Sequence, residues 1–202
     1  MKNRACSMGK ISFLTFIIIL LLTTGAFALS DAYKNNIFTT GLLKPTDSVL
    51  KVKVGSKAPD FTLRSITGDK VTLSQYRGKK NVVLSFVPAA WTPVCSDQWP
   101  GYNIIRDIFD EHDAILLGIT VDNIPTLYAW TNQMGQLWFP VLSDFWPHGK
   151  VAKNYGVLRS DGVTERALFV IDKKGLIRYI DVHNINQRPS LEVLVEELAK
   201  LK

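Results

Sequence analysis

Hydrophobic positions along the chain recur with two different spacings, and these alternate from one segment to the next. Residues 81–87 are almost continuously apolar, which is typical of a strand buried on both faces of a sheet. In residues 96–109 the apolar side chains instead return every three to four positions, as at Ile104 and Ile108, which predicts a helix. This alternation of strands and helices predicts an α/β protein with a central sheet.

The other elements follow from the same two patterns and from the turns between them. Glycine-containing turns predict hairpins within residues 61–73 and 167–182. The remaining predicted elements are strands at 114–121 and 141–143 and helices at 126–134, 150–155 and 191–198. Pro100 and Gly101 lie inside the helix predicted over 96–109, so we expect a kink or a late restart there. The layout predicts a thioredoxin-like fold, in which helices flank a central mixed sheet that carries an N-terminal hairpin.

The N-terminus has the three-part pattern of a secretory signal. Three basic residues among the first ten precede an uncharged apolar run over 11–22, and Ala26-Phe27-Ala28 offers a small-x-small cleavage site. The apolar run alone is shorter than the roughly 20 residues of a membrane-spanning helix. We therefore expect cleavage after Ala28, with an uncleaved anchor through residues 11–28 as the alternative. Either way the protein is predicted to be exported, to the periplasm or the extracellular space.

The chain should accordingly have three parts. Residues 1–28 are the predicted signal peptide or anchor, and residues 52–202 are long enough for one domain with a sizeable core. Between them, residues 29–51 show no sustained hydrophobic period and are interpreted as a spacer or a packed arm.

Charge adds little to this picture. The 202-residue chain has 24 Lys and Arg against 18 Asp and Glu, a formal charge of +6, which becomes 21 − 18 = +3 once three basic residues leave with residues 1–28. The excess is scattered along the chain, so a nucleic-acid partner is not expected. The three histidines, at positions 112, 148 and 183, have no metal-ligand spacing, so no metal site is expected either.

Cys95 is the only cysteine outside the signal region, since the other, Cys6, precedes the apolar run. It is therefore a buried filler, an intermolecular bridge or a reactive thiol. It lies where a helix should begin after the strand over 81–87, and the unpaired N–H groups of a helix start favour a thiolate. A helix end supplies about 0.3–1 kcal/mol, whereas raising the thiolate share of a free cysteine from about 3% to about 90% at pH 7 needs about 3.4 kcal/mol. A hydroxyl, such as that of Thr92, or a guanidinium must contribute the rest.

The pattern Pro88-x-x-x-Thr92-x-x-Cys95 resembles the active-site signature of the peroxiredoxins, the alkyl hydroperoxide reductase and thiol-specific antioxidant family. Further segments that resemble this family, in the same order, are 54–63, 118–122, 139–144, 155–157 and 165–172. The resemblance covers roughly residues 52–200. Gln98 stands where many members carry a glutamate, and in this it is closest to the bacterioferritin-comigratory branch.

The resemblance implies a role for each of five residues. Cys95 would attack the peroxide and become a sulfenic acid, the first step of thiol oxidation. Thr92 would hydrogen-bond the thiolate and the peroxide, and Arg166 would hold both the sulfur and the departing oxygen. Pro88 would limit solvent access, and Gln98 would support the orientation of Arg166. The implied activity is a thiol peroxidase that acts on hydrogen peroxide or organic hydroperoxides and needs no cofactor.

A second cysteine for resolving the sulfenic acid is not evident. Pro100 occupies the position five residues after Cys95, and the C-terminal helix contains no cysteine. The resemblance therefore implies a one-cysteine enzyme that is reduced by an external thiol, either a thioredoxin-like protein or a small thiol, and that forms a homodimer. A thiol–disulfide oxidoreductase would need a Cys-x-x-Cys pair, which the residues around Cys95 do not offer. A redoxin-fold module that binds partners or senses peroxide without efficient turnover remains the alternative.

The five tryptophans have two alternative interpretations. They are expected to be core or dimer-contact residues. Trp91 and Trp99, on either side of Cys95, would alternatively line the mouth of the substrate site.

Overall fold

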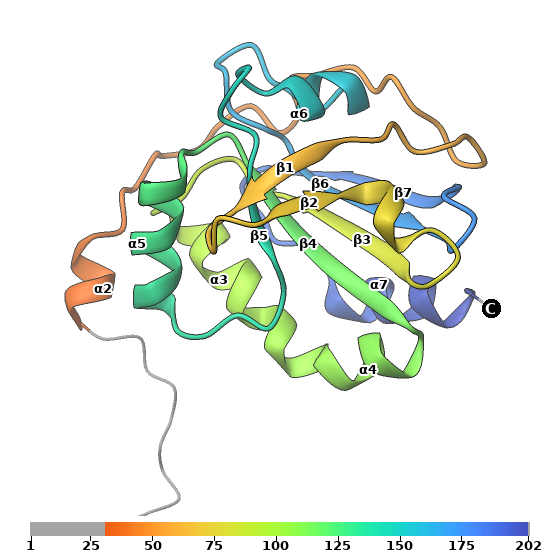
Figure 1. Cartoon of the computed structure of the whole chain (residues 1–202). Helices are drawn as coiled ribbons and strands as arrows, with labels where there is room; N and C mark the ends of the chain where they lie inside the picture. The colour runs from red at the N-terminus through yellow and green to blue at the C-terminus, as the bar shows by residue number, and fades with distance from the viewer. Residues whose placement is uncertain (1–30, 202) are drawn as a thin grey trace, which may run out of the picture.

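A single mixed sheet forms the centre of the molecule in the computed structural model, which describes residues 31–201 (Figure 1). Within that range seven strands follow the order β2-β1-β5-β4-β3-β6-β7. They are β1 (Thr62–Ser65), β2 (Lys70–Thr72), β3 (Asn81–Phe86), β4 (Ala114–Thr120), β5 (Val141–Ser143), β6 (Arg166–Ile171) and β7 (Ile177–His183). The predicted signal segment, residues 1–28, lies outside the described residues.

Strand pairing agrees with the predicted hairpins. β1 pairs antiparallel with β2, and β6 pairs antiparallel with β7, as the turns at 66–69 and 172–176 require. β3 pairs parallel with β4, and β4 pairs parallel with β5. On its other side β3 pairs antiparallel with β6, in a register that sets Phe86 opposite Ala167. The C-terminal end of β3 therefore lies beside the start of β6.

Helices cover both faces of this sheet (Figure 1). They are α2 (Asp31–Asn35), α3 (Pro93–Gly101), α4 (Arg106–Glu111), α5 (Ile124–Met134), α6 (Lys150–Tyr155) and α7 (Leu191–Ala199). Side chains of α2, α3, α4, α5 and α7 pack with Val83 of β3 in one core cluster. Side chains of α6 pack with Leu84 of β3 in the other. β3 is buried throughout and serves both cores, as its continuous apolar run predicted.

The helix predicted over residues 96–109 is divided into three pieces. α3 begins three residues earlier, at Pro93, and contains Pro100. A short 3-10 helix, η2 (Tyr102–Ile105), then leads into α4. Because proline has no N–H to donate within a helix, an interruption near Pro100 and Gly101 is expected, and the prediction of a kink or restart is confirmed.

Close contact between α3 and the sheet depends on a glycine in β4. A Cβ placed on Gly118 would lie 2.8 Å from Cζ2 of Trp99, nearer than such atoms approach in proteins. Trp99 is fully buried and packs against the ring of Trp130 at 4.9 Å between centroids. Both are core residues, whereas Trp146 is 82% exposed and so is not part of the core of this chain.

Residues 36–50, here called the arm, lie along the surface of the domain. Before the arm, Tyr33 of α2 is fully buried, and its hydroxyl accepts a hydrogen bond from Nε1 of Trp130 at 3.1 Å. After it, the amide of Lys51 donates to the carbonyl of Tyr155 at 3.1 Å. Figure 1 shows this segment, in orange, running from α2 past α5 towards α6. The described part of residues 29–51 therefore contacts the domain at several points, while most of its residues are exposed.

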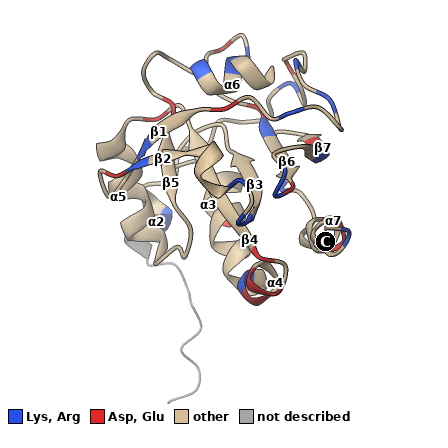
Figure 2. Ribbon diagram, turned by 45° about the vertical axis from the view of Figure 1, so that its right-hand side comes forward, with Lys and Arg blue, Asp and Glu red and all other residues tan. Residues whose placement is uncertain are grey.

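Two further features concern surfaces. In the view of Figure 2, Lys and Arg are spread among Asp and Glu on many of the described elements. Across residues 31–201, none of the helices has the length and apolar character needed to cross a membrane.

Candidate active site

The first turn of α3 carries Cys95. β3 ends at Phe86, a short loop follows, and Thr92 is the last residue before the helix, with an extended backbone (φ −107°, ψ 151°). Pro93 takes the first helical position, which suits a residue without an N–H. Cys95 is therefore the third helical residue, where backbone N–H groups have no partner within the helix and the dipole favours negative charge. Its side chain is completely buried.

The loop before α3 has one unusual backbone conformation. Trp91 has φ of 62°, in the left-handed region that non-glycine residues seldom adopt. Its carbonyl accepts a hydrogen bond from the amide of Phe38 at 2.7 Å, and its ring lies 6.1 Å from that of Tyr33. Contacts with the N-terminal segment therefore support this conformation next to the thiol.

Arg166, the first residue of β6, brings a buried positive charge to the sulfur. Its Nη2 lies 3.5 Å from Sγ of Cys95. Nε and Nη2 also donate to the carbonyl of Ile185, at 3.1 and 3.0 Å, and Nη1 donates to Oε1 of Gln98 at 2.5 Å. The planar guanidinium is thus held on three sides, and its charge stays directed at the thiol.

Gln98 is fixed by partners on both ends of its amide. While the oxygen accepts from Arg166, Nε2 donates to the hydroxyl of Tyr102 at 2.8 Å and to that of Ser85 at 3.3 Å. Nε1 of Trp99 also donates to Ser85 at 3.4 Å. All these groups are buried, and burial is the main reason that the pKa of Tyr102 is raised above its ordinary value. The network is uncharged except at Arg166.

Sequence reasoning missed Ser85 and Tyr102. Ser85 is a lone hydroxyl in the apolar strand β3, and Tyr102 follows Gln98 by four residues, on the same side of the helical segment. A polar side chain in a fully buried strand needs a hydrogen-bond partner, so Ser85 within the apolar run was the signal in the sequence that could have indicated this network.

Thr92 and Pro88 belong to the segment that leads into α3, and in the described contacts neither hydrogen-bonds the thiol. The Thr92 hydroxyl donates to the carbonyl of Ala89 at 2.9 Å. Among the contacts of residues 31–201, none joins Thr92 to Cys95, so the expected hydrogen bond to the sulfur is not present in this state. Pro88 is buried and lines the same pocket as Thr92.

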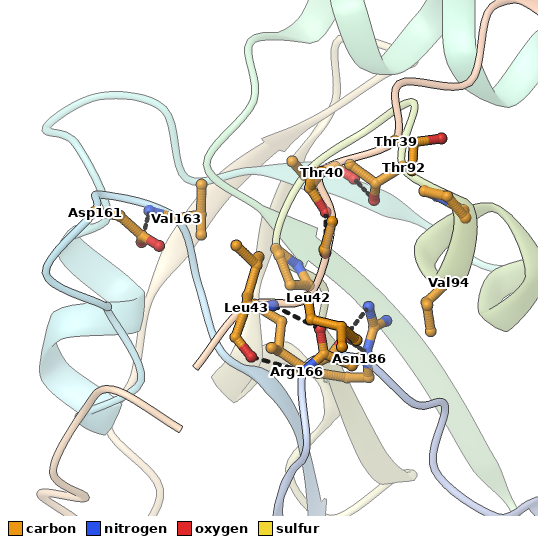
Figure 3. A pocket seen from close by; sticks show the side chains of 15 residues that line it. Thr39, Thr40, Leu42, Leu43, Thr92, Val94, Asp161, Val163, Arg166 and Asn186 are labelled. Carbon is orange, nitrogen blue, oxygen red and sulfur yellow. Dashed lines mark hydrogen bonds between the residues drawn. The ribbon is translucent and has the colours of Figure 1, made fainter. Parts of the chain in front are cut away.

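A pocket of about 480 Å³ opens beside these residues (Figure 3). Its walls are the loop before α3, the start of β6, residues 185–186 and residues 39–43 of the arm. Arg166 and Thr92 belong to the lining, whereas Cys95 is fully buried and is not among the lining residues. Neither Trp91 nor Trp99 lines this pocket, so the alternative role predicted for these two tryptophans is not seen here.

Buried polar contacts hold the walls of the pocket. Thr164 donates to the carbonyl of Val87 at 2.7 Å, and Asp122 accepts from the amide of Ala90 at 2.8 Å. Glu165 and Arg159 form a buried ion pair at 2.8 Å just before β6. In the part of the chain from 31 to 201, no group of three or more His, Cys, Asp or Glu side chains is arranged to hold a metal ion.

The arrangement is a buried thiol at a helix start, with an arginine against the sulfur and a pocket that reaches the same arginine. The model of the AhpC/TSA family matches residues 54–180, which include all five predicted site residues. The chain belongs to this family. It is a peroxiredoxin, and therefore a peroxidase that reduces peroxides with a thiol.

Relatives agree with this assignment. Alkyl hydroperoxide reductase E of Mycobacterium tuberculosis is 39% identical over 151 residues, which are 74% of this chain and 98% of that protein. The 2-cysteine peroxiredoxin of Chattonella marina is 35% identical over 146 residues, 68% of this chain and 74% of that protein. The reduced 2-Cys peroxiredoxin of Plasmodium vivax has a similar structure, with a TM-score of 0.69 and 30% identity over 73% of this chain and 81% of that one. The predicted family, fold and enzyme class are thereby confirmed.

Proposed function

We propose that Cys95 is the nucleophile of a one-cysteine peroxidase that acts on hydrogen peroxide or organic hydroperoxides. The observation that carries this proposal is the 3.5 Å contact between Nη2 of Arg166 and the Cys95 sulfur, in the first turn of α3. The helix start and the guanidinium both favour the thiolate, the form of a cysteine that attacks peroxides.

In the proposed step the Cys95 thiolate attacks the terminal oxygen of the hydroperoxide. An S–O bond forms as the O–O bond breaks, so the sulfur loses two electrons and becomes a sulfenic acid. The other oxygen leaves as an alkoxide or hydroxide and takes a proton from water. Charge moves from sulfur to the leaving oxygen, and the Arg166 guanidinium can stay close to both because Ile185 and Gln98 already hold it in place.

Thr92 is proposed to contact the peroxide from the pocket side. Its hydroxyl now donates to Ala89, and its oxygen can still accept a hydrogen bond. A bound hydroperoxide could donate to this oxygen while its own oxygens accept from Arg166. Pro88 would keep bulk water from the same position.

Regeneration is proposed to use an external thiol, from a thioredoxin-like protein or a small molecule. A first thiol would condense with the sulfenic acid, which releases water and leaves a mixed disulfide on Cys95. A second thiol would then free Cys95 and carry away the disulfide. Since Cys95 is completely buried, the first turn of α3 must open before a protein thiol can reach the sulfur.

Dimer formation and export are further parts of the proposal. Phe145 and Trp146, which are 47% and 82% exposed, are apolar side chains that a second copy would cover. Export is proposed from the basic, apolar and small-residue pattern of residues 1–28. Sedimentation of the protein and the mass of its N-terminal peptide after expression test these two points.

The first test is intact-mass analysis after one equivalent of hydrogen peroxide with a sulfenic-acid trap present. A fast, stoichiometric adduct on Cys95 is expected, and Arg166→Ala should slow its formation by orders of magnitude. Arg178→Ala is the matched control, since this arginine lies on β7 and pairs with Asp172. If Cys95 reacts no faster than a free thiol, the proposal is wrong.

The alternative of a binding or sensing module predicts a different outcome. Such a module would form the sulfenic acid once and turn over slowly with any thiol donor, and its partner binding would survive Cys95→Ser. Multiple-turnover assays with thioredoxin and with small thiols separate the two.

A further inference from the structure

The arm forms one wall of the active-site pocket. Residues 39–43 line it together with the loop that leads into α3, and Figure 3 labels Thr39, Thr40, Leu42 and Leu43 among the lining residues. The family model begins at residue 54, so this wall lies outside the part of the chain that the model describes.

Hydrogen bonds hold the wall on both sides. Upstream, the amide of Phe38 donates to the carbonyl of Trp91 at 2.7 Å. Downstream, the side-chain amide of Asn186 pairs with the backbone of Leu43, whose N–H donates to Oδ1 at 2.9 Å and whose carbonyl accepts from Nδ2 at 2.8 Å. Residues 39–42 are exposed between these two attachments, so the wall is fixed at its ends and open to a ligand.

The arm is also joined to the residues that hold Arg166. The amide of Ile185 donates to the carbonyl of Pro45 at 3.1 Å, and the carbonyl of Ile185 accepts from Arg166. Nearby, the amide of Asp47 donates to Glu165, the residue before Arg166, at 2.5 Å. These hydrogen bonds of Pro45 and Asp47 therefore fix the position of the arm relative to the Arg166 guanidinium.

The lining of the pocket is largely apolar. Its apolar side chains come from the arm, from the loop before α3, from the first turn of α3 and from residues 163–185; among them are Leu42, Leu43, Pro88, Val94, Val163 and Ile185. Arg166 and Asp161 are the ionisable lining residues among those described, and Arg166 faces the thiol. Asp161 is paired with Arg159 at 3.3 Å, so apart from Arg166 the described lining offers no cation for a negatively charged substrate tail.

The size of the pocket also exceeds the needs of hydrogen peroxide. The volume of about 480 Å³ is typical of sites for small organic ligands, of about 300–1,000 Å³. Hydrogen peroxide is comparable to two water molecules, each with a share of about 30 Å³ in the liquid. Most of the apolar wall would be unused by so small a substrate.

We propose that residues 39–43 of the arm are a specificity element, which makes the enzyme favour hydroperoxides with a bulky, uncharged apolar group over hydrogen peroxide. This inference rests on the proposed function of Cys95. The O–O group would lie against Arg166, and the apolar group would contact Leu42 and Leu43.

The test compares cumene hydroperoxide with hydrogen peroxide as oxidants of Cys95. Second-order rate constants are measured by rapid quenching with a sulfenic-acid trap, and their ratio is the readout. Leu42→Ser should lower the ratio of cumene hydroperoxide to hydrogen peroxide about five- to tenfold, the order expected for partial loss of one apolar contact. Leu42 is 91% exposed, so its replacement should not disturb folding. Asn186→Ala, which releases Leu43, should lower the ratio in the same direction.

Val49→Ser is the matched control, because Val49 is 83% exposed on the same arm and does not line the pocket. It should keep the wild-type ratio. An unchanged ratio in both Leu42→Ser and Asn186→Ala, with fast oxidation by both peroxides, would overturn the specificity role and leave the proposed function intact. An equal loss in Val49→Ser would also overturn it. If neither peroxide oxidises wild-type Cys95 faster than a free thiol, the proposed function itself fails.

Discussion

Arg166 donates to Gln98 through a 2.5 Å hydrogen bond whose acceptor is an amide oxygen with no formal charge. A carboxylate at this position would orient the guanidinium equally well but would neutralise part of its field. With an amide, the positive charge of Arg166 remains available to the Cys95 sulfur, 3.5 Å from Nη2. The orienting partner therefore does not compete with the thiolate for the arginine.

Gln98→Glu should slow the oxidation of Cys95 at neutral pH. The carboxylate takes up part of the Arg166 charge that otherwise acts on the sulfur and on the departing oxygen. Stopped-flow oxidation by hydrogen peroxide from pH 5 to 9 measures this. Gln98→Leu is the comparison: it removes one buried partner from Arg166, which keeps the carbonyl of Ile185, and one from Tyr102, which keeps Ser85, and it should lower the rate at every pH. A profile for Gln98→Glu that coincides with wild type would contradict this argument.

Arg166→Lys should lower the rate of Cys95 oxidation at least about 100-fold although the charge is kept. One ammonium group cannot contact the sulfur, Gln98 and the carbonyl of Ile185 in the fixed geometry of a guanidinium. The same stopped-flow assay at pH 7 checks this, with circular dichroism to verify folding. A folded lysine variant that retains most of the rate would show that charge alone is sufficient.

Thr92→Val and Thr92→Ser should differ. Valine removes the hydroxyl that donates to Ala89, which costs about 1 kcal/mol of stability, and it removes the proposed contact with the peroxide. We expect the valine variant to oxidise at least about tenfold more slowly, while serine stays within about threefold of wild type. Equal rates for the two variants would remove Thr92 from the proposed mechanism. Urea unfolding and single-turnover rates give the two quantities.

Stability should fall as the pH rises above about 10. Burial raises the pKa of Tyr102 in the folded protein, so above the ordinary tyrosine value the unfolded chain holds fewer protons than the folded one. The stabilisation is therefore complete below about pH 10 and is lost progressively above it. Urea unfolding between pH 8 and 11 should show this decline. Tyr102→Phe, though less stable at pH 8, should show a smaller decline, and an unaltered slope would exclude Tyr102 as a contributor. Burial also raises the pKa values of Tyr33, Tyr76, Tyr155 and Tyr179, which contribute to the remaining slope.

Most of the central sheet could be predicted from the hydrophobic pattern alone. A strand buried on both faces needs consecutive apolar residues, and a tight hairpin turn favours glycine. Both requirements involve residues close together in the sequence, so β3 and the two hairpins could be predicted from short segments. The contact between Cys95 and Arg166, which are 71 positions apart, could not be predicted from the spacing of hydrophobic residues. It came from the resemblance to a family.

The arm and the details of the site had no comparable signal. The arm is held by single contacts such as Asn186 to Leu43, which span 143 positions and leave no periodic trace. The Thr92 hydroxyl turns to Ala89 within a loop in which Trp91 has a positive φ, and such a loop conformation depends on its neighbours. Trp146 is exposed because large apolar residues are not confined to the core of a single chain.

Gly118 of β4 helps to set the position of α3, the helix that carries Cys95. Trp99, which lies one helical turn after Cys95, fits against the sheet because no side chain projects from Gly118. Even a methyl group there would lift the tryptophan, and the sulfur would rise with the helix while Arg166 remained on β6. The burial of the thiol therefore depends on the sheet beneath the helix, where Gly118 has no Cβ atom.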